Sequence, residues 1–327
     1  MPKVAVIGAG HWGKNLVRNF SNLDALAGIC ESNPKSLDTI TTDYPGVQTW
    51  TSHETLLADD DVEVVAIATP AGTHGELVEA ALRAGKSVFV EKPLCLDLDQ
   101  AYDLKGLAEE FDQILMVGHL MLYHPAFNAL LSAVRRGDVG KLRYIYSTRL
   151  SLGQIRREEN ALWSFAPHDI SMILALAERV PEEVIANGGT YLRDGIADTT
   201  LSHLTFSENL KAHLFVSWLH PYKDHRMVVI GSESMIVFDD NLPGPDKLLR
   251  FDHTIGWDGG LPSVSKAKGI PIPYDYEEPL LCECRHFLDC VENRKRPMSD
   301  VAEGIQVLSV LDACQRSLNS GQPVRLT

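Results

Sequence analysis

The chain has 327 residues, 45% of them hydrophobic and 23% charged, which is typical of a folded globular protein with two domains of ordinary size. The formal net charge of −14 at pH 7 argues against nucleic acid and anionic membranes as partners. No apolar run reaches the roughly 18 residues of a membrane span, and a strand pattern occupies the place of a signal peptide, so we expect a cytoplasmic protein.

The first elements predict a dinucleotide site. The apolar run 4–7 precedes a G-x-G-x-x-G turn, residues 14–20 continue as a helix, and a second apolar run, 26–30, ends at an acid. Glycines allow a tight turn and a close approach to a pyrophosphate, which a helix N-terminus attracts. A carboxylate about 20 residues downstream accepts from a ribose 2′-OH and repels a 2′-phosphate, which favours NAD over NADP. The residues concerned are Gly8, Gly10, His11, Trp12, Gly13 and Glu31.

Strand and helix patterns then alternate as far as residue 117. We expect strands at 62–68, 87–90 and 114–117 and helices at 52–58, 74–84 and 98–111. Continuous apolar strands between helices indicate a parallel sheet covered on both faces. The sequence therefore predicts an α/β fold with a doubly wound Rossmann domain over residues 1–121.

Three turns follow strands of this domain. Ligands of doubly wound folds bind at the carboxyl ends of strands, so these turns are expected to face the cofactor. The expected contacts are Thr69, Pro70, His74, Glu91, Lys92 and His119, with Thr73 as a helix cap before His74.

Lys92 has a second possible role. A lysine at a strand end in a cofactor crevice can exchange a proton with a substrate hydroxyl while hydride leaves the carbon. Pro93 would stiffen the chain beside it. Spacing alone leaves open the alternative of a solvated surface charge.

The second half has a different pattern. A helix at 126–136, a strand at 142–150 and a helix at 163–178 precede strand patterns at 184–189, 199–206, 211–217, 226–231 and 235–238. Consecutive strands without helices predict a large, mostly antiparallel sheet. Residues 240–280 show little periodicity and are expected to form a lid or a subunit contact. Two helices close this second domain, 122–327, unless they pack back on the first.

Histidine and cysteine positions leave alternatives open. Pro167-His168-Asp169 is expected to open the helix of the second domain, where a histidine is structural or an acid–base group. Cys282, Cys284, His286 and Cys290 crowd together on an amphipathic helix. We interpret these as core and surface thiols and expect no metal site.

Several motifs together resemble the Gfo/Idh/MocA oxidoreductases. The matching pieces are the turns at 8–13 and 69–74, Glu91-Lys92-Pro93, His168-Asp169-Ile170, and the closing stretches 285–290 and 321–324. The resemblance implies a Rossmann domain followed by an α/β domain with a large open sheet that packs against another subunit, as a homodimer or homotetramer. It also implies oxidation of a sugar or cyclitol hydroxyl with NAD, in which Lys92 and His168 handle the hydroxyl.

One position departs from the family pattern. Many members have an aspartate four residues before this histidine, whereas this chain has Ser164. The sequence is more similar to members that act on UDP-N-acetylglucosamine and related UDP-amino sugars, also around His119–Pro125. The resemblance therefore implies oxidation of the 3-hydroxyl of a UDP-N-acetylhexosamine, for cell-envelope glycan synthesis.

A diphosphate substrate requires cations. Arg149, Arg156 and Arg157 precede the helix that carries His168, and guanidinium groups bind phosphate oxygens bidentately. The alternative for the last two arginines is a solvated loop paired with Glu158 and Glu159. The expected substrate-binding residues are Tyr123, Arg156, Arg157, Trp163, Ser164 and His168. A dehydrogenase of a free sugar or cyclitol and a non-catalytic, cofactor-bound regulator are the alternative functions.

Overall fold

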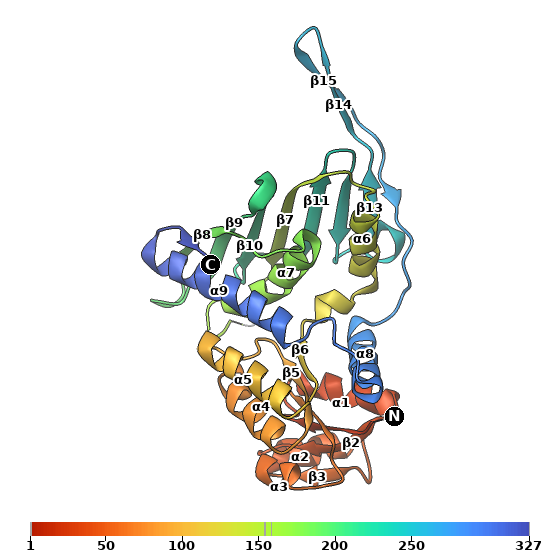
Figure 1. The fold of residues 1–327 in the computed structure, drawn as a ribbon, viewed down its shortest axis with the longest axis vertical. Coiled ribbons are helices and arrows are strands. Elements are labelled where there is room, and N and C mark those ends of the chain that lie inside the picture. Colours follow the sequence, from red (N-terminus) through yellow and green to blue (C-terminus); the bar gives the residue numbers. More distant parts are fainter. Residues whose placement is uncertain (1, 154, 158, 327) are drawn as a thin grey trace. The chain divides into compact units, whose positions relative to one another are not determined.

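The computed structural model describes residues 2–153, 155–157 and 159–326, so that Glu158 lies outside the described residues. The chain divides into two units. The first comprises the residues up to Leu120 together with Glu278–Leu308, and the second comprises Met121–Glu277 and Ser309–Thr327. Each unit has its own sheet (Figure 1).

The sheet of the first unit is entirely parallel, in the order β3-β2-β1-β4-β5-β6. Its strands are β1 (Val4–Ile7), β2 (Leu26–Cys30), β3 (Gln48–Trp50), β4 (Val64–Ile67), β5 (Ser87–Glu91) and β6 (Leu115–Gly118). All residues of β1, β4, β5 and β6 are buried, as expected for strands covered on both faces. This order reverses between β1 and β4, where doubly wound sheets bind their ligands.

The helices of this unit are α1 (Gly13–Asn22), α2 (Pro34–Thr41), α3 (His53–Leu57), α4 (His74–Arg83), α5 (Leu98–Glu110) and α8 (Pro279–Asn293). A short 3₁₀ turn, η1 (Ala71–Thr73), precedes α4. Phe287 of α8 packs edge-on against Phe89 of β5, with ring centroids 5.7 Å apart. The last helix, α9 (Val301–Ser320), begins in the first unit and ends in the second.

The second unit contains a nine-stranded sheet in the order β16-β13-β12-β11-β7-β10-β9-β8-β17. Only β7 and β10 are parallel; the other neighbours are antiparallel. The strands are β7 (Leu142–Leu150), β8 (Glu183–Gly189), β9 (Thr199–Thr205), β10 (Lys211–Ser217), β11 (Asp224–Gly231), β12 (Met235–Asp239), β13 (Leu248–Phe251), β16 (Ile270–Pro271) and β17 (Val324–Arg325).

Helices cover one face of this sheet. They are α6 (Pro125–Arg135), α7 (Ala161–Ala177) and the end of α9, where Ser317 Oγ accepts from the amide of Ala186 in β8 (Figure 1). Short 3₁₀ turns lie at η2 (Leu120–Tyr123), η3 (Ser207–Asn209) and η4 (Gly244–Lys247). None of the helices in the described ranges is long and apolar enough to cross a membrane.

The structure confirms the α/β class, the Rossmann sheet and the large mixed sheet. It adds α2 and β3, which the sequence patterns did not predict. The expectation of an irregular segment at 240–280 is wrong, because this segment forms η4, β13, a separate hairpin of β14 (Thr254–Asp258) and β15 (Leu261–Ser265), and β16. These strands are two to five residues long, too short for a periodicity signal between glycines and prolines.

Candidate functional site

The predicted glycine turn lies between β1 and α1. Gly8 has φ +89°, and a Cβ there would lie 2.9 Å from the Ala68 carbonyl oxygen after β4. A Cβ on Gly13 would lie 1.9 Å from the Gly8 carbonyl oxygen, so the packing of the protein itself requires these two glycines. A Cβ on Gly10 would meet no protein atom within 4 Å. The open space at Gly10 is where a dinucleotide site requires its pyrophosphate to approach the backbone.

Glu31 is fixed beside this turn. Its Oε2 accepts from the amide of Ala9 at 2.9 Å, and its Oε1 accepts from the amide of Asn33 at 3.0 Å. The carboxylate therefore joins the ends of β1 and β2, at the sheet edge where a ribose hydroxyl would need an acceptor. His11 and Trp12 are exposed on the turn.

His74 holds two turns together. Its ring is 1% exposed, and Nε2 lies 2.8 Å from the Thr69 carbonyl oxygen while Nδ1 lies 2.7 Å from the Pro93 carbonyl oxygen. Each ring nitrogen thus lies within hydrogen-bond distance of one carbonyl oxygen, one from each turn. His74 thereby fixes the turn after β4 against the turn that carries Lys92.

Thr73 occupies the predicted N-cap position of α4, but its side chain does not cap the helix. The Thr73 hydroxyl makes no cap hydrogen bond to α4; it donates instead to the Pro70 carbonyl oxygen at 2.8 Å and lies 2.8 Å from the Thr69 hydroxyl. The cause is the 3₁₀ turn η1, which gives Thr73 helical backbone angles rather than the extended ones of a capping residue. Thr69 is half-buried and Pro70 is exposed.

Glu91, the residue before Lys92, is a buried acid. One of its oxygens accepts from the indole N–H of Trp12, and the other accepts from the Lys92 amide at 3.3 Å. Burial outweighs these hydrogen bonds and raises the pKa of Glu91 to about 7. Lys92 follows at the carboxyl end of β5 and is half-buried.

A second buried acid, Glu283 of α8, was missed by the sequence reasoning. Its side chain is 0% exposed, and neither carboxyl oxygen has a hydrogen-bond partner among the described residues. Burial, with Glu91 as a second cause, raises the pKa of Glu283 well above its usual range. The available signal was an acid on the apolar face of a helix that also presents Leu280, Cys284 and Phe287.

His119 lies after β6, buried at 1% exposure. Its Nδ1 lies 2.5 Å from Oε2 of Glu303 in α9. The first unit thus brings the predicted cofactor residues together at one edge, because the carboxyl ends of parallel strands meet there. No group of three or more His, Cys, Asp or Glu residues placed to hold a metal was found in the described part of the chain.

The helix α7 carries the predicted residues of the second unit. The expectation that Pro167-His168-Asp169 opens this helix is wrong, because Pro167 lies inside it. Asn160 is the N-cap, and its side chain accepts from the Trp163 amide at 3.1 Å. Ser164 is therefore buried one turn before His168, which is half-buried in mid-helix.

A buried ion pair follows His168 directly. Asp169 is 1% exposed; its Oδ2 accepts from Arg149 Nε at 2.5 Å, and its Oδ1 accepts from the Ser147 hydroxyl. Arg149 Nη1 lies 3.3 Å from His225 Nδ1, and burial, followed by the charge of Arg149, lowers the pKa of His225 to about 3. The Arg149 guanidinium thus holds α7 against β7 through Asp169, and we do not assign it to the binding of an external anion.

The other predicted substrate residues are more dispersed. Arg156 lies 3.5 Å from Glu159 and is exposed, and the carbonyl of Arg157 accepts from Arg193 at 3.2 Å. The indole of Trp163 donates to Gln315 of α9 at 3.0 Å, and Tyr123 is buried at the end of η2. Substrate contacts by these residues remain a prediction.

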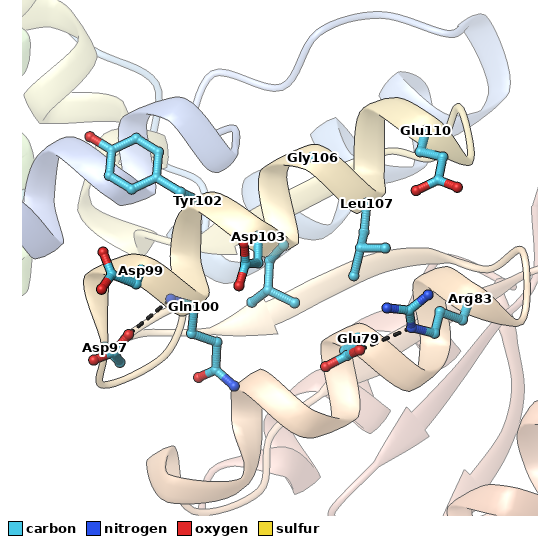
Figure 2. A pocket seen from close by; sticks show the side chains of 11 residues that line it. Glu79, Arg83, Asp97, Asp99, Gln100, Tyr102, Asp103, Gly106, Leu107 and Glu110 are labelled. Carbon is cyan, nitrogen blue, oxygen red and sulfur yellow. Dashed lines mark hydrogen bonds and ion pairs between the residues drawn. The ribbon is translucent and has the colours of Figure 1, made fainter.

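A concavity of about 660 Å³ lies between α4 and α5 (Figure 2). Figure 2 shows that Arg83, its only basic lining residue, is turned toward Glu79 on its own helix, with which it forms an ion pair of 2.9 Å. The remaining charges are acidic: Glu79, Asp97, Asp99, Asp103 and Glu110. Such a lining repels anionic nucleotides, and none of the predicted site residues contributes to it.

Two family models match this chain. Residues 2–119 match the oxidoreductase family with an NAD-binding Rossmann fold, and residues 127–237 match the GFO/IDH/MocA C-terminal domain. The glycine turn and Glu31 are thus parts of an NAD-binding Rossmann domain.

Similar proteins span the whole chain. A UDP-N-acetylglucosamine 3-dehydrogenase from Acidithiobacillus ferrooxidans is 26% identical over 94% of each chain, and its solved structure superposes with a TM-score of 0.85 at 97% coverage of each. A scyllo-inositol 2-dehydrogenase (NAD⁺) from Bacillus subtilis is 26% identical over 99% of this chain and 96% of that one. A crystal structure from Magnetospirillum magnetotacticum is 31% identical, with a TM-score of 0.82, and covers 96% of this chain and 100% of that one. The chain therefore belongs to the Gfo/Idh/MocA family of NAD-binding oxidoreductases.

Proposed function

We propose that this enzyme oxidises the ring 3-hydroxyl of a UDP-N-acetylhexosamine to a ketone, with NAD as the hydride acceptor. The observation that carries the proposal is the similarity, over 94% of each chain, to a UDP-N-acetylglucosamine 3-dehydrogenase. The serine at position 164 is in agreement, since it distinguishes this chain from the inositol-type pattern with an aspartate four residues before the histidine.

Lys92 and His168 are the proposed catalytic residues. The substrate hydroxyl loses its proton as its carbon loses hydride, so one group must accept the proton and another must orient the oxygen. Lys92 follows the end of β5, where two contacts fix the backbone: the Lys92 amide donates to Glu91, and the His74 ring contacts the Pro93 carbonyl oxygen. His168 stands on a helix whose next residue is fixed by a buried ion pair. Rigid support of this kind keeps a proton-transfer group in its productive geometry.

Arg156 or Arg157 is the proposed diphosphate ligand. The net charge of −14 means that an anionic substrate needs local cations. Arg156 has an ion-pair partner in Glu159 at 3.5 Å, a weak surface contact that a phosphate would replace with stronger bidentate hydrogen bonds.

A free sugar or cyclitol is the second candidate substrate. It is favoured by the similarity to scyllo-inositol 2-dehydrogenase over 99% of this chain. The two candidates differ in their need for the arginines, because only a nucleotide sugar carries a diphosphate.

Absorbance at 340 nm with purified protein and NAD tests the proposal. We expect NADH formation with UDP-N-acetylglucosamine or its uronic acid, and none with glucose or myo-inositol. Lys92→Met should reduce turnover by about 100-fold or more, whereas Lys105→Met, which alters a half-buried lysine of α5, should not. Arg156→Gln with Arg157→Gln should raise KM for the UDP-sugar, and the control Arg136→Gln should leave it unchanged.

If NADH forms with inositol and not with the UDP-sugars, the substrate is the free cyclitol of the second candidate function. Full activity of Lys92→Met would refute the proposed role of the lysine whatever the substrate. An unchanged KM in the arginine double variant would refute the diphosphate contact.

A further inference from the structure

A buried histidine–carboxylate pair lies at the end of β6. His119 Nδ1 lies 2.5 Å from Oε2 of Glu303 in the first turn of α9. The His119 side chain is 2% exposed and that of Glu303 17%, so solvent screens the contact only weakly. The other Glu303 oxygen, Oε1, is buried without a hydrogen-bond partner among the described residues. The histidine is thus the partner of this carboxylate, and the proton transfer proposed above uses neither residue.

Close packing of α9 on β6 fixes the Glu303 carboxylate. The Val117 amide donates to the Ser299 carbonyl oxygen at 2.8 Å, and the Ser299 hydroxyl donates to the Val117 carbonyl oxygen at 2.6 Å. A Cβ on Gly304 would lie 2.7 Å from Val117 Cγ2, so glycine is what lets α9 approach the strand this closely. The Asp300 side chain accepts from the Glu303 amide at 2.9 Å and thereby caps the first turn. Rigid support of this kind is typical of a functional group held in one geometry.

The register of β5 and β6 places His119 beside Lys92. Glu91 pairs with Gly118 across the two parallel strands, and Lys92 and His119 are the residues that follow them. A Cβ on Gly118 would lie 3.2 Å from Cδ of Glu91, so the Glu91 carboxyl lies against the backbone just before His119. Neighbouring strands are about 4.8 Å apart, a gap that a lysine side chain can span.

Glu91 is the electrostatic neighbour that both groups share. Burial raises its pKa to about 7 and outweighs the Trp12 hydrogen bond and the charges of Lys92 and His119, all of which lower it. The lysine and the histidine therefore both lie within electrostatic reach of one buried carboxyl. A positive charge that moves from Lys92 to His119 stays beside this carboxyl and gains the Glu303 carboxylate as a neighbour.

Oxidation of an alcohol leaves one proton that the site must release. When the substrate carbon gives hydride to NAD, its O–H bond breaks and the proton goes to the Lys92 amine, which becomes an ammonium. The ammonium must lose this proton before the next turnover. An imidazole whose Nδ1–H is held by a carboxylate presents Nε2 as its proton acceptor. His119 is such a group at the neighbouring strand end.

We propose that His119, oriented by Glu303, takes up the proton that Lys92 removes from the substrate hydroxyl. An N–H bond of the Lys92 ammonium breaks and an N–H bond forms at His119 Nε2. The imidazolium keeps its Nδ1–H bond to Glu303, and the proton goes to water when the product leaves. Glu303 acts only through the ring and is therefore a positioning residue. The inference rests on the role proposed for Lys92 and on no particular substrate.

Chemical rescue tests the proposal with the substrate that the NADH assay identifies. His119→Ala should lower kcat by about 100-fold, and imidazole added to the buffer should raise the kcat of this variant by about tenfold. The added base can occupy the space that the ring leaves and accept the proton there. His53→Ala, which alters a half-buried histidine of α3, should show neither effect. Titration with NADH checks that both variants are folded and bind the cofactor.

Glu303→Gln tests the same step without removal of the ring. The amide oxygen still accepts from Nδ1–H but carries no charge to stabilise the imidazolium. We expect kcat to fall by about tenfold and the solvent isotope effect on kcat to increase, because proton transfer becomes slower than hydride transfer.

Three results would overturn the proposal: full activity of His119→Ala, a loss of activity that imidazole leaves unchanged in a variant that binds NADH, or equal solvent isotope effects in Glu303→Gln and the wild type. Failure of the proposed function is distinguishable, because it is detected in the substrate panel and in Lys92→Met.

Discussion

Glu91→Gln should remove a pH dependence of stability in the first unit. Burial raises the pKa of Glu91 to about 7, against 4.5 for an exposed glutamate. The folded state therefore binds a proton that the unfolded chain releases near pH 4.5, and stability falls as pH rises from there to about 7. Because Glu91 is only 9% exposed, solvent screening is small and each pKa unit is worth about 1.4 kcal/mol. Between pH 5 and pH 8 the wild-type protein should lose about 2.5 kcal/mol more than Glu91→Gln.

Hydrogen exchange of the β5 amides at several pH values measures this loss within the unit concerned. Glu283→Gln is the comparison variant, because Glu283 is also buried and burial, followed by the charge of Glu91, raises its pKa well above the usual range. This variant leaves the Glu91 carboxyl in place, so we expect it to keep the wild-type loss of stability between pH 5 and pH 8. If Glu91→Gln and the wild type lose the same stability between pH 5 and pH 8, burial does not control this carboxyl and the reasoning fails.

Three further substitutions test the site and the core. Glu31→Gln should raise the NADP-to-NAD ratio of kcat/KM by about tenfold or more, since it removes a negative charge from the ribose end of the site. Arg149→Met should destabilise the second unit by about 3–5 kcal/mol in urea unfolding, because it leaves Asp169 buried without its cation, and Asp169→Asn in the same chain should recover part of that loss. Phe287→Ala should cost about 3–5 kcal/mol in hydrogen exchange of the first unit, since it opens a cavity beside Phe89. A loss below 1 kcal/mol in either stability measurement, or an unchanged cofactor ratio, would contradict the corresponding argument.

The fold of the first unit was largely predictable from local patterns. Buried parallel strands are continuous apolar runs, so the positions of β1, β2, β4, β5 and β6 could be inferred directly. Short elements such as β3, with three residues, carry no such signal. In the second unit, Pro167 was misplaced at a helix start because proline favours the first turn, whereas α7 accommodates it in its interior.

The positions of the site residues along the chain could be inferred from strand ends, but their partners could not. The bond from Trp12 to Glu91, the His74 bridge to Pro93 and the pair of Arg149 with Asp169 join residues 19 to 79 positions apart. No periodicity or spacing relates such positions, since they meet only when strands and turns are assembled.

The sequence by itself determined the NAD-binding turn, the acid at the end of the second strand, the lysine after β5 and the family. These follow from short-range rules in which glycine, apolar runs and turn residues act over a few positions. Only the tertiary structure decided that Arg149 is an internal cation, that Glu283 is a second buried acid and that β14 and β15 form an exposed hairpin. Burial and charge pairing decide these properties, and both depend on which distant segments fold against one another.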